Sequence, residues 1–230
     1  MRLRAVALVV GLAVGSALAG CSGGGPAGGG PAGAAPTPLP LRLSDLLPTA
    51  GQLPPGFKLL TDSSAATPEI RRSIATAPCT DLVADHFLSV HSRPSEVASV
   101  SLEKPPVGSD FQDRWYGEET LGRYGPNEAE GFMRAVRDTA QSCASYHTVL
   151  PGDDSSTAVT VSTRDAGVPA DEGLVLRTSM AEPSGTWVAE VAFVREGNVI
   201  LTVDTVLEEE PGFGVDAVLP AVVTAYRDKS

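Results

Sequence analysis

The sequence predicts one α+β domain, a mainly antiparallel twisted sheet with helices packed on one face. Helical patterns occur at the beginning, in the middle and at the end of the segment from residue 41 to residue 230. Four segments rich in β-branched residues precede the last helix. Short turns join the last three of these segments, which is typical of antiparallel hairpins. Amphipathic helices beside such a meander cover its apolar side.

Short elements are expected before residue 127. A proline ends the first helical turn, and a capping threonine followed by a proline favours a helix start at residue 67. Alternating apolar residues indicate strands in this part of the chain. The expected helical turns span 44–47 and 80–87, a further helix starts at Thr67–Pro68, and the expected strands span 57–60, 99–103 and 113–124.

The segment 127–142 carries the strongest helical pattern in the chain. Its apolar residues recur at steps of three and four, whereas Arg134, Arg137 and Asp138 lie off that stripe. Cys143 continues the stripe and is therefore expected on the buried face. The apolar positions are Ala129, Phe132, Met133, Val136, Ala140 and Cys143.

Four strands and one helix are expected after Gly152. Turns at 182–185 and 195–198 separate the last three strands. Asp216 is expected to cap the final helix, and Pro220 lies in its first turn, where a missing amide hydrogen costs little. The expected strands span 158–163, 174–180, 186–194 and 199–206, and the helix buries Leu219, Val222, Val223 and Tyr226.

The first forty residues predict an export signal and a tether. Arg2 and Arg4 precede an uncharged apolar run that ends at Leu18, the pattern of a signal peptide over residues 1–20. The run is too short for a spanning helix, which needs roughly 20 apolar residues. Residues 21–40 are expected to be a tether, because seven glycines and five prolines follow Cys21 there. The extracytoplasmic domain then spans residues 41–230.

The segment Leu18-Ala19-Gly20-Cys21 resembles the lipobox of bacterial lipoproteins. The resemblance implies cleavage before Cys21 and lipid, including palmitate, attached through its thiol. Buried acyl chains stabilise membrane association by about 0.8 kcal/mol per methylene, so a doubly acylated cysteine stays at the cell membrane. The alternative is an ordinary secreted protein with an unmodified cysteine.

The charge of the chain restricts its partners. The formal net charge is −11, and it becomes −13 when the two arginines of residues 1–20 are removed. Such a charge disfavours nucleic acid and anionic membrane surfaces as partners. The membrane is expected to be reached through lipid alone, and the further partners are a small molecule or an envelope protein.

Two cysteines remain beside the lipidated one. Cys79 and Cys143 would lie in an oxidising compartment, where a disulfide between them is the default expectation. Such a bond would tie the long helix to the segment around residue 80. The alternatives are two free thiols or half of a metal site, although no histidine accompanies either cysteine at zinc-site spacing.

The order of these features resembles the PknH-like extracellular sensor domain, which occurs on receptor kinases and on stand-alone lipoproteins of high-GC Gram-positive bacteria. The matching features are the lipobox and tether, Cys79, the strand with Trp115, the helix that ends in Ala140-Gln141-Ser142-Cys143, and the hairpins around Trp187. Members usually carry two disulfides, whereas this domain can form one. The resemblance implies a twisted antiparallel sheet with a cleft proposed to bind a small molecule, and a sensing or binding role without catalysis.

Motifs of catalysis do not occur after Cys21. There is no nucleophile elbow, Walker loop, zincin motif, Cys-x-x-Cys pair or EF-hand loop. We therefore expect no enzyme, no metal and no cofactor. His86 and His91 are interpreted as surface histidines, and His147 as a polar group at a helix end. The acidic pairs and triplet at 118–119, 153–154 and 208–210 are interpreted as solvated loops.

Three aromatic residues are the candidate ligand-cleft residues: Trp115, Tyr116 and Trp187. An aromatic side chain at the mouth of a cleft supplies a flat apolar wall, and the alternative is packing in the core. The expected function is a non-catalytic sensor or binding module for a small molecule, a cell-wall fragment or a partner protein. The alternatives are an enzyme acting on the envelope and an interaction lipoprotein without a pocket.

Overall fold

The computed structural model describes residues 41–60, 78–83, 91–106, 114–149, 156–182, 185–207 and 214–230. The chain divides into the units Met1–Leu39 and Pro40–Ser230, and the described residues all belong to the second. No helix within the described ranges is long and apolar enough to cross a membrane. The expected signal peptide, the tether and the helix start at Thr67 lie outside the described residues.

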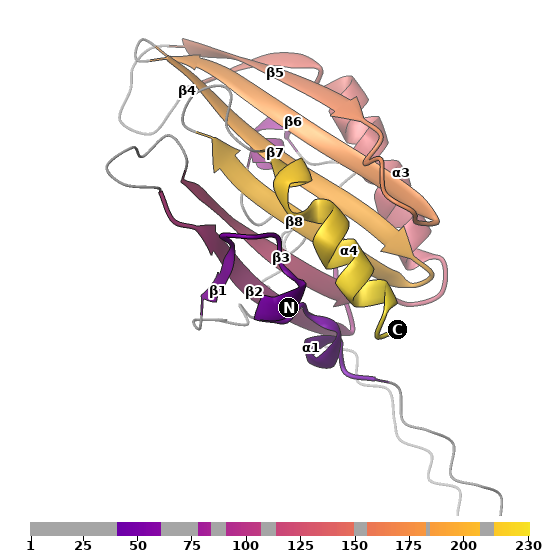
Figure 1. Ribbon diagram of the computed structural model, residues 1–230. Coiled ribbons are helices and arrows are strands. Elements are labelled where there is room, and N and C mark those ends of the chain that lie inside the picture. Colours follow the sequence, from indigo (N-terminus) through magenta and orange to yellow (C-terminus); the bar gives the residue numbers. More distant parts are fainter. Residues whose placement is uncertain are drawn as a thin grey trace, which may run out of the picture. The chain divides into compact units, whose positions relative to one another are not determined.

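One eight-stranded sheet forms the centre of the described domain (Figure 1). Its strand order is β1-β2-β3-β8-β7-β6-β5-β4, and every neighbouring pair is antiparallel. The strands are β1 (Lys58–Leu60), β2 (Glu96–Lys104), β3 (Trp115–Arg123), β4 (Ser145–Val149), β5 (Ser156–Arg164), β6 (Glu172–Glu182), β7 (Gly185–Glu196) and β8 (Val199–Leu207). The helices are α1 (Leu43–Leu46), α3 (Glu128–Ser142) and α4 (Leu219–Arg227), with 3-10 turns η1 (Ala50–Gln52), η3 (Cys79–Val83) and η5 (Val215–Ala217).

Two meanders make up the sheet. Strands β1 to β3 form one and β4 to β8 the other, and they join where β3 pairs with β8, with Leu121 opposite Leu201. The hairpin between β7 and β8 has a two-residue loop in which Gly197 has φ of 58°. That left-handed conformation favours glycine, because a side chain would meet the backbone. The expected hairpins of the C-terminal half are thus present.

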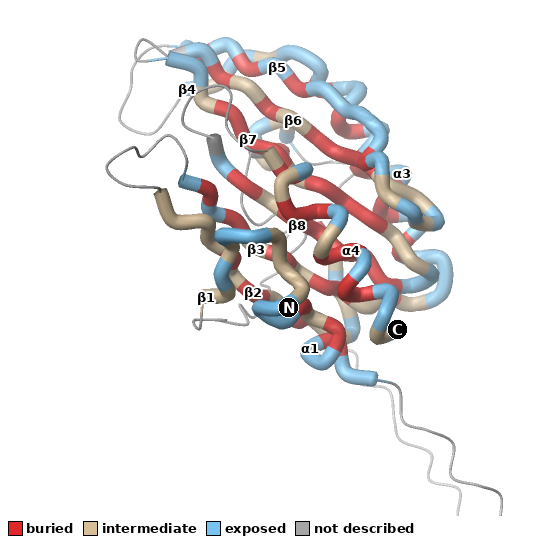
Figure 2. Tube along the Cα trace, in the orientation of Figure 1, coloured by how far each residue is buried: buried red, intermediate tan, exposed pale blue. Residues whose placement is uncertain are grey.

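Helices cover both faces of the sheet. In the orientation of Figure 1, α4 lies in front of the strands and α3 behind them. We call the side that packs against α1 and α4 the α4 face, and the side that packs against α3 and η3 the α3 face. Each face buries its own apolar cluster, and buried residues run along the central strands in Figure 2.

The α+β class, the single domain and the mainly antiparallel sheet are confirmed. The structure differs from the expectation of helices on one face, because β7 is apolar on both sides. Ala192, Phe193 and Val194 are 0–1 % exposed, and Phe193 points to the α3 face while its two neighbours point to the α4 face. A strand buried on both sides requires cover on both sides.

The two long helices bury the stripes that the sequence predicts. All six apolar positions named for the helix 127–142 are buried, and so are the four named for the final helix. Asp216 does not cap α4, which is a correction to the sequence prediction. The residue lies in η5, where its carboxylate accepts a hydrogen bond from Arg164 at 2.8 Å, and α4 begins only after Val218.

Strand β4 is absent from the sequence prediction. The chain passes from the end of α3 at Cys143 almost directly into Ser145, and β4 pairs with β5. Its five residues alternate between exposed and half-buried, so they have no strong apolar period. His147, expected at a helix end, is an exposed residue of this strand.

Candidate functional site

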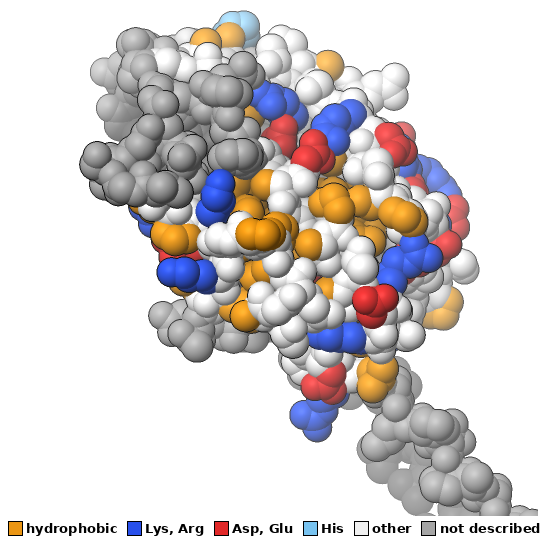
Figure 3. Space-filling view, in the orientation of Figure 1, with side chains coloured by type: hydrophobic (Ala, Val, Ile, Leu, Met, Phe, Trp, Pro, Cys, Tyr) orange, Lys and Arg blue, Asp and Glu red, His pale blue; other side chains and the backbone are white. Residues whose placement is uncertain are grey.

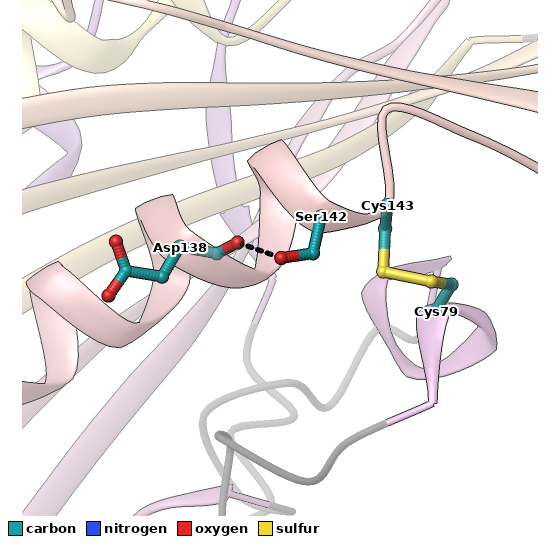
Figure 4. The surroundings of a disulfide bond; sticks show 4 residues. All are labelled: Cys79, Asp138, Ser142 and Cys143. Carbon is teal, nitrogen blue, oxygen red and sulfur yellow. Dashed lines mark hydrogen bonds between the residues drawn. A yellow bond between two sulfur atoms is a disulfide. The ribbon is translucent and has the colours of Figure 1, made fainter.

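A disulfide joins Cys79 to Cys143 and links η3 to the end of α3 (Figure 4). Cys143 is 3 % exposed and ends the apolar stripe of α3. Near it, Ser142 donates a hydrogen bond to the Asp138 carbonyl oxygen at 2.8 Å. Leu82 of η3 is buried in the same apolar cluster. The bond therefore fastens the short η3 turn to the layer behind the sheet.

The histidines do not gather into a site among the described residues. His91 is 8 % exposed rather than a surface residue, and its Nε2 lies 3.2 Å from Asp81 Oδ2 in η3. His147 lies on β4 opposite Ala158, and His86 lies outside the described residues. Within the described ranges, no three histidine, cysteine or acidic side chains lie close enough to hold a metal ion.

The three candidate cleft residues do not lie on one face. Trp115 is 2 % exposed on the α4 face, where its ring meets Phe57 edge-on at 5.2 Å between centroids. Tyr116, the next residue of β3, is 51 % exposed and points to the α3 face. Trp187 is half-buried and shares the α3 face through its register in β7. Trp115 is thus a core residue, and of the three only Tyr116 and Trp187 share a face of the sheet, on strands that β8 separates.

Two buried side chains hold one peptide group in front of the sheet. Trp115 Nε1 donates to the Gly214 carbonyl oxygen at 3.3 Å, and the Val215 amide donates to Glu190 Oε2 at 3.1 Å. Arg177 donates to the other oxygen of Glu190 at 3.0 Å. The Gly214 carbonyl oxygen and the Val215 nitrogen belong to the same peptide group. Their bonds to Trp115 and Glu190 therefore fix the start of η5 and hence the approach to α4.

Glu119 is a buried carboxyl group in the middle of β3. It is 0 % exposed, and neither side-chain oxygen has a hydrogen-bond partner among the described residues. It pairs in register with Val100 of β2 and Val203 of β8, both buried. Burial raises the pKa of Glu119 to about 8, although the charge of Lys229 acts in the opposite direction. The carboxyl group is therefore mainly protonated at neutral pH.

Sequence reasoning placed Glu118 and Glu119 together in a solvated loop, and the structure separates them. Glu118 points to the α3 face and accepts a hydrogen bond from Thr120 Oγ1 at 3.2 Å, whereas Glu119 points into the core of the α4 face. The signal was present in the sequence. In a strand, Glu119 shares a side with Trp115 and Leu121, which are both apolar.

Lys229 connects the segment after α4 to the end of α1. It follows α4, and its Nζ donates to the carbonyl oxygen of Leu47, the residue directly after α1. Its charge lowers the pKa of Glu119, so the two side chains interact electrostatically. Lys229 therefore ties the residues after α4 to the end of α1, and its charge acts on Glu119 of β3.

The surface over α4 is apolar in its middle. In Figure 3, hydrophobic side chains gather near the centre of the visible face, and charged side chains surround them. Leu53, Phe57 and Ala217 are partly buried residues packed against the core of this face. A shallow depression between η1 and α4 is lined by Gln52, Pro220, Ala221, Thr224, Ala225 and Asp228.

The chain matches no protein-family model and no curated protein. Among solved structures it is similar to the extracellular domain of PknH from Mycobacterium tuberculosis, with a TM-score of 0.45 and 12 % sequence identity. The similarity covers 80 % of this chain and 93 % of that chain.

Proposed function

We propose that this protein is a lipoprotein of the extracytoplasmic face of the cell membrane, with a domain that binds or senses without catalysis. The observation that carries the proposal is Cys21, directly after Leu18-Ala19-Gly20 and before a Gly- and Pro-rich segment. The bond between Cys79 and Cys143 supports it, because disulfides persist in oxidising compartments outside the cytoplasm. The acyl chains would supply the membrane affinity that an acidic chain lacks.

The anchor is tested by metabolic labelling of the full chain with a palmitate analogue, followed by membrane fractionation. The unaltered protein is expected to carry label and to sediment with the membranes, and Cys21→Ala to lose both. The matched control is the double variant Cys79→Ser, Cys143→Ser, which removes the other two cysteines and is expected to keep the label. A Cys21→Ala protein that is still labelled would overturn the anchor.

The binding surface we propose is on the α3 face around Tyr116 and Trp187. Both side chains are accessible there, and an aromatic ring offers a flat apolar wall for a sugar ring or another small molecule. Thr205 donates a hydrogen bond to the Tyr116 carbonyl oxygen at 2.7 Å, which holds β3 and β8 together beneath the ring. A cell-wall fragment combines such sugar rings with a peptide.

The test uses detergent-purified full-length protein and a pool of soluble muropeptides, with tryptophan fluorescence as the readout. Ligand is expected to change the emission of Trp187, so Trp187→Phe should lose the signal, because buried Trp115 remains unaffected. Tyr116→Ala is expected to weaken binding about tenfold, equivalent to ~1.4 kcal/mol. His147→Ala, which alters an exposed residue of the edge strand β4, is the control and should bind normally.

Two results would contradict the binding proposal. If no muropeptide changes the fluorescence or the thermal transition, the ligand class is wrong. If turnover of a muropeptide is measured, the domain is an enzyme of the envelope, which was the alternative from the sequence.

A further inference from the structure

The side chain of Glu119 is buried on the α4 face, which two short helices, α1 and α4, help to cover. One apolar cluster contains residues of both helices together with the sheet residues on either side of Glu119. Its members from the helices are Leu43 and Leu46 of α1 and Leu219, Val222 and Tyr226 of α4. The hydrogen bond from Lys229 to the Leu47 carbonyl oxygen ties the end of α4 to the end of α1. We call α1, α4 and residues 228–230 the cover.

The cover is the part of this core that can open most easily. Beneath it, β3 is bonded on both sides, to β2 and to β8, around the position of Glu119. The cover consists of a four-residue helix and a nine-residue helix. Short helices packed on a sheet open at lower free energy than its hydrogen-bonded central strands. Water therefore reaches the carboxyl group by displacement of the cover.

We propose that the cover is a pH-sensitive device that closes over the sheet as the surroundings become more acidic, with the Glu119 carboxyl group as the proton-binding site. A neutral carboxyl group is buried at moderate cost, whereas a buried carboxylate without hydrogen bonds is strongly unfavourable. Closing is therefore favoured when Glu119 carries a proton. This inference concerns regulation of the domain and is independent of the lipid anchor.

The sign of the effect follows from the two states. With the cover open, Glu119 is hydrated and has the ordinary pKa of 4.5, and with the cover closed the pKa is about 8. Between pH 4.5 and about pH 8 the closed form therefore binds more protons than the open form. Its stability falls as the pH rises through this range. The opening constant rises by up to about tenfold per pH unit in this window. Below the window the closed form has its full stability, and above it the loss is complete.

Other charged groups face this core at a distance from Glu119 or with partners of their own. Glu190 is bonded to Arg177 and Val215, and Arg123 is bonded to Glu96. Lys229 is the charged group that lowers the pKa of Glu119. Within the part of the chain that the structure describes, the other charged groups of this face, η5 and the cover include Asp45, Lys104, Arg164, Glu196, Asp216, Arg227 and Asp228, and Tyr226 is a further titratable group.

Hydrogen exchange at pH 5.5, 6.5 and 7.5 tests the proposal, with rates corrected for intrinsic exchange. In the unaltered full chain, the corrected exchange rates of the α1 and α4 amides are expected to rise by as much as about tenfold per pH unit. Glu119→Gln, which stays neutral, should keep these amides protected at all three values. The control is Glu118→Gln, a change at the next residue on the opposite face, which should retain the pH dependence.

A second measurement needs no variant and covers the case in which Glu119→Gln fails to fold. Infrared titration of the unaltered protein should show the carbonyl band of one neutral carboxyl group that persists at pH 6.5 and disappears near pH 8. The proposal is overturned if that band is absent at pH 6.5, or if the protection of α1 and α4 is independent of pH. Loss of protection that is equal in the cover and in β3 would also overturn it.

Discussion

At the scale of single residues, Gly214 lies where no side chain fits. A Cβ atom there would lie 2.1 Å from Glu190 Oε2, the oxygen that accepts the Val215 amide hydrogen. Gly214→Ala is therefore expected to lower the free energy of unfolding by about 1–3 kcal/mol, because Glu190 must give up a bond made within the core. Urea denaturation measures the change.

Gly131 is the matched control for this prediction. It lies in the exposed part of α3, and a Cβ atom there would have nothing within 4 Å. Gly131→Ala is expected to raise the free energy of unfolding by about 1 kcal/mol, since alanine favours the helix and restricts the unfolded chain. The account is wrong if both alanine variants change stability in the same direction.

The burial of individual side chains could be predicted from the sequence where the spacing of apolar residues followed a clear helical period. The buried stripe of α3 followed from steps of three and four, and all of its members are buried. Glu119 was missed because the acidic pair suggested solvent, although the period of two in β3 contradicted it. The environment of Trp115 depends on contacts with Phe57 and Gly214, which come from distant parts of the chain. No local pattern reveals such contacts.

At the scale of elements, the disulfide adds a covalent link between η3 and the end of α3 to the packing of Leu82 and the pair of Asp81 and His91. It joins residues separated by 64 positions, so it restricts the unfolded chain considerably. The double variant Cys79→Ser, Cys143→Ser is expected to lose about 2–4 kcal/mol of stability. Thermal unfolding with and without reductant measures this, and reductant should have no effect on the variant. Equal stability of the two proteins would contradict the prediction.

Most elements could be predicted because their patterns are long. Strands β2, β3 and β5 to β8 and helices α1, α3 and α4 all lie within a few residues of their expected positions. Strand β4 was missed because five residues with one polar face do not make a recognisable period. The capping role given to Asp216 was wrong because a 3-10 turn intervenes before α4.

At the scale of the whole domain, the sheet has two cores rather than one. The sequence predicted antiparallel hairpins correctly, but the number of covered faces depends on how the two meanders join. That junction places β8 and β7 in the middle of the sheet, where both sides need cover. Strand order is a property of distant pairing, and the local periodicity of each strand does not contain it.

The junction between β3 and β8 also affects the route by which the protein is made. Thr202 donates a hydrogen bond to the carbonyl oxygen of Thr120, 82 residues earlier in the chain, so this ladder forms late. Until β8 has been synthesised and has paired, β3 has an open edge that can pair with another chain. A chaperone that shields the early strands until the later ones are made would therefore favour correct folding of this domain.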